Sequence, residues 1–114
     1  MADAEKIAAI PLPVIAAREA YIACLHAANA YLLEVSGDVP RSHKGVHFEF
    51  RKACMAEDRI SLRHAEALQK LYRIKENTDY GDRSMVTVES LPDIMQSARD
   101  LIAAVRQAIE RDAG

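Results

Sequence analysis

Apolar residues recur at the spacing of an α-helix in four segments of the chain, and the first of these segments is apolar on nearly every side. It follows a Pro-Leu-Pro sequence and ends at a Ser-Gly sequence, which predicts a helix from about Val14 to Val35. One broad side of it carries Tyr21, Cys24, Leu25, Ala28, Tyr31, Leu32 and Val35, and an adjacent stripe carries Ala16, Ala20, Ala23, Ala27 and Ala30. The remaining arc still includes Ile22 and Leu33. Such a helix is either central in a bundle or covered by a partner subunit.

The same periodicity predicts three further helices, over about 46–57, over about 62–76 with Ser61 as the N-cap, and from 87–90 to about 111. The last of them has the tightest apolar stripe: Leu91, Ile94, Ala98, Leu101, Ile102, Val105 and Ile109. A short extra helix is expected over 4–10, where two prolines stop it. We therefore predict an all-α fold, an antiparallel up-and-down bundle of four main helices, in a single domain over 1–114 with its core in 14–111.

Composition agrees with closely packed helices, because 20 of the 114 residues are Ala, only six are aromatic and none is Trp. Charged residues interrupt the long apolar runs and the first residues are acidic, so we expect neither a membrane span nor a secretory signal, and a cytoplasmic location. Cys24 and Cys54 are interpreted as reduced core residues. A disulfide or a metal role is the alternative, but no spacing pattern in the sequence supports it.

Charge is distributed unevenly along the chain. Residues 41–75 carry nine basic and four acidic side chains, whereas both 1–40 and 76–114 are net acidic. The basic segment also contains three of the four histidines. Its charge could hold RNA or a nucleotide phosphate, or could form a solvated face neutralised by the acidic ends. In the acidic C-terminal segment, Asp79 and Asp82 are interpreted as carboxylates of a turn rather than as an acid–base pair.

The histidines suggest no metal site or cofactor. His43 and His47 have a four-residue spacing that metal ligands use, but Gly45 lies between them at the expected junction of loop and helix. We therefore interpret both as loop and surface residues. His64 lies on the apolar side of its helix, which predicts a buried histidine. The sequence contains no glycine-rich phosphate loop and no serine-hydrolase arrangement.

Three stretches, taken in order, resemble the HEPN family, small helical domains named after nucleotide binding in higher eukaryotes and prokaryotes. Residues 20–33 resemble the family's aromatic and Ala-rich second helix, and 40–46 with the phenylalanines that follow resemble a Pro-Lys-Thr-His-Ser-Gly-Val loop of one prokaryotic branch. Arg73 followed by Asp79 and Tyr80 resembles that branch's Arg-x-x-x-Asp-Tyr motif, with two extra residues in between. Order and spacing agree over about residues 14–110.

The resemblance implies an up-and-down bundle that forms a homodimer, often with a nucleotidyltransferase encoded alongside. Many family members are metal-independent ribonucleases, frequently toxins, in which an Arg and a His four to six residues later line a cleft at the dimer interface. Arg73 matches that Arg by position, but Asp79 replaces the His, and a carboxylate at neutral pH is a poorer general acid. Two other pairs, Arg41 to His47 and Arg59 to His64, have the same spacing, as chance allows with ten Arg and four His in the chain.

The leading hypothesis is a dimeric HEPN-like module that binds RNA or a nucleotide, or pairs with a nucleotidyltransferase, as in toxin–antitoxin systems. The binding residues expected for it are Arg41, His43, Lys44, Arg73 and Tyr80. The second hypothesis is an active metal-independent ribonuclease toxin, with Arg73, Asp79 and His43 as the catalytic candidates. In it Arg73 stabilises the phosphate charge and His43, His47 or Asp79 moves protons. A structural protein whose helix faces assemble a complex is the third.

Overall fold

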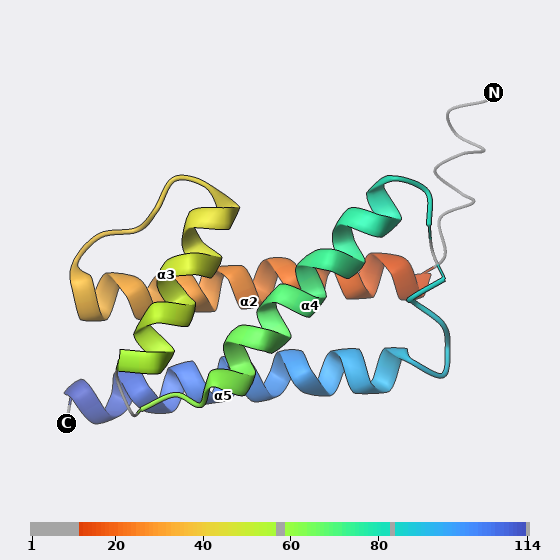
Figure 1. Ribbon diagram of the computed structural model, residues 1–114. Coiled ribbons are helices and arrows are strands. Elements are labelled where there is room, and N and C mark those ends of the chain that lie inside the picture. The colour runs from red at the N-terminus through yellow and green to blue at the C-terminus, as the bar shows by residue number, and fades with distance from the viewer. Residues whose placement is uncertain (1–11, 57–58, 83, 114) are drawn as a thin grey trace.

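The computed structural model describes residues 12–56, 59–82 and 84–113, and these ranges form four helices and no strand. The helices are α2 (Leu12–Ser36), α3 (His43–Ala56), α4 (Leu62–Asp79) and α5 (Leu91–Ala113) (Figure 1). The predicted all-α helical bundle is therefore confirmed. The short helix expected over 4–10 lies outside the described residues.

Helix α2 occupies the centre of the bundle. Both α2 and α4 pack against all three other helices, but the contacts of α2 are the more extensive. In Figure 1, α5 runs alongside α2 in the same direction, and α3 and α4 lie across the pair. From the sequence, a helix that is apolar on nearly every side could be either central in the bundle or covered by a partner subunit. In the structure α2 is central. Its outer arc nevertheless leaves Ile22 and Leu33 exposed.

The predicted apolar faces form one buried core. On α2 the predicted side is buried except for the partly buried Val35, and on α5 the core residues follow at intervals of three and four. The alanine stripe of α2 is only partly covered, since Ala23 and Ala30 are exposed. Cys24 and Cys54 are buried free thiols, and burial raises their pKa to about 12 and about 11.

Two helix ends differ from the sequence-based prediction. Helix α3 begins at His43, three residues before the expected start, because the Ser42 Oγ accepts a hydrogen bond from the Gly45 N–H at 3.0 Å. A Cβ on Gly45 would lie 3.0 Å from Pro40 Cβ, so glycine lets the chain turn tightly into the helix. Helix α4 continues to Asp79, and Gly81 ends it with a φ of 92°.

These changes matter for the site. With Gly45 inside the first turn of α3, His43 and His47 lie one turn apart on the same helix, so the prediction that they lie in a loop was wrong. His43 is exposed, as a surface residue should be, and His47 is partly buried. Asp79 likewise belongs to α4 and not to a turn. Asp82 does lie in the turn, where its carboxylate accepts hydrogen bonds from the backbone N–H and the hydroxyl of Ser84.

Candidate functional site

A groove of about 460 Å³ runs between α3 and α4. Four residues from each helix line it: Lys44, His47, Phe48 and Arg51 from α3, and Gln69, Tyr72, Arg73 and Glu76 from α4. Both sets follow the i, i+3, i+4, i+7 spacing of a single helix face. One face of α3 and one face of α4 therefore form the two walls of the groove.

The groove is cationic and partly aromatic. Lys44, Arg51 and Arg73 contribute three positive charges against the one carboxylate of Glu76, and none of these three forms an ion pair among the described residues. The Phe48 ring is 62% exposed, although an apolar side chain of this size is usually buried. Unpaired cations beside an exposed ring suit a ligand that carries both phosphates and bases.

Two histidines and two tyrosines meet at the inner wall of the groove. The hydroxyl of Tyr21, from α2, lies 2.9 Å from Nε2 of His47 and 3.3 Å from Nδ1 of His43. The Tyr72 ring stands edge-on to the His47 ring, with the ring centroids 4.8 Å apart. Tyr21 is completely buried, His47 is partly buried and His43 is exposed. The cluster thus extends from the core through the groove wall to solvent.

The environment of this cluster sets its protonation. Burial lowers the pKa of His47, a positive charge on His43 lowers it further, and Glu76 opposes both effects. Burial, with the neighbouring Tyr72 and Glu76, raises the pKa of the Tyr21 hydroxyl. A hydrogen bond to Glu76 raises the pKa of Tyr72. At neutral pH the groove therefore holds a neutral His47, able to accept a proton, against a tyrosine that keeps its own.

The three stretches on which the family resemblance rests converge here, through Tyr21, His43 and Arg73. A sequence model of the HEPN domain matches residues 3–108, which is most of the chain. The chain belongs to the HEPN family. No curated protein and no solved structure matched it. Membership indicates an RNA-related or nuclease-like module, and HEPN domains commonly dimerise.

The expected HEPN site residues are not all in one place. Lys44 and Arg73 line the groove, and His43 adjoins it through Tyr21. Arg41 is exposed in the turn before α3, outside the groove lining, and Tyr80 is an 89% exposed residue just after α4.

Asp79, which stands where the family His was expected, is engaged elsewhere. Its carboxylate lies 3.0 Å from the guanidinium of Arg18 and 3.0 Å from the ammonium of Lys75. It is not among the residues that line the groove with Arg73. Asp79 therefore ties the end of α4 to the start of α2.

Several groove residues were not among the site residues expected from the sequence. Phe48, Arg51 and Tyr72 line the groove and Tyr21 adjoins it, but none of the four was named as a site candidate. A signal was available, because 44, 47, 48 and 51 share one helix face if the helix begins at His43. The expected start at 46 separated Lys44 from the rest of that face.

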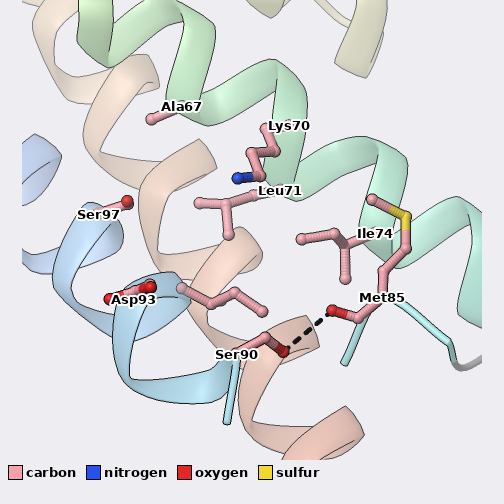
Figure 2. A pocket seen from close by; sticks show the side chains of 9 residues that line it. Ala67, Lys70, Leu71, Ile74, Met85, Ser90, Asp93 and Ser97 are labelled. Carbon is pink, nitrogen blue, oxygen red and sulfur yellow. Dashed lines mark hydrogen bonds between the residues drawn. The ribbon is translucent and has the colours of Figure 1, made fainter. Parts of the chain in front are cut away.

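The HEPN bundle has a second pocket, of about 250 Å³, on the other side of α4 (Figure 2). Its lining consists of Ala67, Lys70, Leu71, Ile74, Met85, Ser90, Asp93, Ile94 and Ser97. The floor is aliphatic, and the one cation, Lys70, is balanced by the one carboxylate, Asp93. This pocket lacks the excess charge and the exposed ring of the α3–α4 groove.

The histidines and cysteines form no metal cluster in the described ranges, where no three His, Cys, Asp or Glu side chains converge. The buried position predicted for His64 is confirmed, with 6% of the residue exposed. No helix in the same ranges is both long and apolar enough to cross a membrane.

Proposed function

We propose that this HEPN domain binds single-stranded RNA in the groove between α3 and α4. The observation that carries the proposal is the set of three cations, Lys44, Arg51 and Arg73, that share one groove with the exposed ring of Phe48. None of the three is ion-paired with another described residue. The cations contact successive phosphates, and bases stack on Tyr72 and on the face of Phe48 opposite the Lys52 ammonium, which lies 5.3 Å from the ring centroid. Family membership supports RNA as the class of ligand.

The proposal is tested by fluorescence anisotropy with a labelled single-stranded oligoribonucleotide at several salt concentrations. Three phosphate contacts give a slope of log K against log salt of about −2, because each contact contributes about −0.7 with single strands. Arg73→Ala weakens binding and reduces the slope by about 0.7. The matched control is Lys70→Ala, which removes a cation from the opposite side of α4. Equal effects of both variants, or a slope near zero, would contradict binding in the groove.

Cleavage of the bound RNA is a second candidate function, favoured by the position of His47 beside Arg73 in the groove. In this reaction His47 accepts the proton of a ribose 2′-hydroxyl, the 2′-oxygen attacks the adjacent phosphorus and the bond to the 5′-oxygen breaks, with a proton from water completing the leaving group. Arg73 stabilises the charge on the phosphate. The reaction needs no metal.

Incubation of labelled RNA with the protein in EDTA tests cleavage. The expected products carry 2′,3′-cyclic phosphate ends and disappear in His47→Gln and Arg73→Ala. In cells, overexpression arrests growth and Arg73→Ala abolishes the arrest. Full RNA integrity in both settings would reject the nuclease and leave RNA binding as the function.

A homodimer is part of the proposal, formed through the outer arc of α2. Ile15, Ile22 and Leu33 are exposed there, with 40%, 39% and 56% of each residue accessible. Their spacings of seven and eleven residues return to the same side of a helix, so a second copy can cover all three at once. Ile22→Asp should convert the dimer to a monomer in light scattering, whereas Lys70→Asp should not. A wild-type monomer would contradict this part.

A nucleotidyltransferase is the partner proposed from family membership, in a toxin–antitoxin type of pair. Co-expression with a neighbouring nucleotidyltransferase gene tests it. Co-purification and relief of growth arrest are the expected results. A protein whose growth effect is unchanged by that enzyme would contradict the pairing.

A further inference from the structure

The Tyr21 hydroxyl lies between two imidazole nitrogens, 2.9 Å from His47 Nε2 and 3.3 Å from His43 Nδ1. A hydroxyl group has a single hydrogen to donate, and it can accept through its lone pairs. A neutral imidazole has one N–H and one bare nitrogen. The hydrogen bonds of the three groups are therefore interdependent.

The hydroxyl keeps its hydrogen, since Tyr21 is completely buried and its pKa is raised. Two arrangements satisfy all three groups. In the first, Tyr21 donates to His43 and accepts the Nε2–H of His47, which leaves Nδ1 of His47 bare. In the second, His43 Nδ1–H donates to Tyr21 and Tyr21 donates to His47 Nε2, so His47 carries its hydrogen on Nδ1.

A proton on His43 removes the first arrangement. Both nitrogens of a protonated imidazole are donors, so Tyr21 can then only accept from His43. The buried hydrogen of the Tyr21 hydroxyl finds an acceptor in this cluster only by donation to His47. Burial opposes a charge on His47, whereas the His43 ring is exposed to solvent. Other ionisable or charged side chains of α2, α3 and α4 lie around the cluster: Arg18, which is paired with Asp79, and Lys44, Tyr72, Arg73 and Glu76.

We propose that Tyr21 is a positioning residue that couples the two histidines, so that protonation of the exposed His43 moves the ring hydrogen of His47 from Nε2 to Nδ1. His47 lines the groove, and Nε2 faces Tyr21, so Nδ1 is the nitrogen left for a ligand. A bare Nδ1 accepts a proton from a ribose hydroxyl, and an Nδ1–H donates to a phosphate oxygen. This consequence for RNA rests on the proposed function.

Nitrogen-15 NMR of the histidine rings tests the coupling without RNA, since bare and protonated nitrogens resonate far apart. In the wild type, the His47 Nδ1 resonance should shift strongly upfield over the pH range in which His43 takes up its proton. In Tyr21→Phe, which keeps the ring and removes the hydroxyl, that shift should be lost. Tyr31→Phe removes another completely buried tyrosine hydroxyl from α2 and should behave as the wild type.

The coupling is overturned if His47 keeps one tautomer in the wild type while His43 protonates, or if His47 still follows His43 in Tyr21→Phe. If Tyr21→Phe does not fold, His43→Leu tests the coupling instead. In His43→Leu, His47 should no longer change its tautomer over the pH range in which it does so in the wild type. RNA binding is measured separately. If the histidines are coupled and the protein binds no RNA, the coupling is supported and the proposed function is rejected. If the histidines are not coupled and the protein binds RNA, the coupling is rejected and the proposed function is supported.

Discussion

Helix α4 presents two different surfaces on its two sides. Toward α3 it contributes Gln69, Tyr72, Arg73 and Glu76 to a cationic groove, and toward α5 it contributes Ala67, Lys70, Leu71 and Ile74 to a pocket with balanced charges. Leu71 and Ile74 are buried, whereas Arg73, between them in sequence, is exposed. One helix therefore contributes to the core on one side and to the proposed RNA-binding groove on the other. Substitutions on the two sides should separate these properties.

The largest effect is expected on the α5 side. Leu71→Ala removes a side chain that is only 3% exposed and should lower the free energy of unfolding by about 2–5 kcal/mol, because a cavity replaces lost contacts. Urea unfolding measures this change. RNA affinity of the folded variant should stay unchanged. A loss below about 0.5 kcal/mol would show that the floor of the α4–α5 pocket is not part of the core.

The second effect belongs to the groove. The double variant Lys44→Glu and Arg73→Glu replaces attraction to two phosphates by repulsion and should weaken RNA binding about 100-fold at low salt. Its free energy of unfolding should change by less than about 0.5 kcal/mol, since both side chains are exposed. Lys70→Glu is the control on the α5 side, with anisotropy as the measurement. A similar loss in that control would mean that the charge of the whole domain, and not the groove, holds RNA.

A smaller effect is expected from the helix caps. Ser42→Ala and Ser61→Ala each remove an N-cap hydroxyl and should cost about 1 kcal/mol of stability. Only Ser42→Ala should also weaken RNA binding, because the first turn of α3 carries His43 and Lys44. Urea unfolding and anisotropy on both variants make the comparison. Equal binding by the two would show that the groove does not depend on the start of α3.

The smallest effect is a pH dependence shared by both sides. Burial lowers the pKa of His47 beside the groove and of His64 on the α5 side below the ordinary 6.5. The unfolded chain therefore binds more protons than the folded chain as the pH falls below that value, and the free energy of unfolding decreases from pH 7 to pH 5.

Urea midpoints across this pH range measure the effect. His47→Gln and His64→Gln should each flatten the decrease. A decrease that persists unchanged in both buried-histidine variants would assign it to other groups.

The sequence by itself determined the existence of the four helices, the faces they bury and the cap of α4, because periodicity and capping residues such as Ser61 act within a few residues of the chain. It also placed a positive segment in the middle of the chain and carried the family motifs. It did not determine the start of α3 or the end of α4. The tertiary structure decided which charges share a surface. Arg73 and Lys44 meet only because α3 and α4 pack beside each other on α2, and Asp79 leaves the site because α4 extends far enough to reach Arg18. Tyr21 likewise contacts two histidines that lie 22 and 26 positions further along the chain. The burial that shifts the pKa values of Tyr21 and His47 arises only when the helices pack.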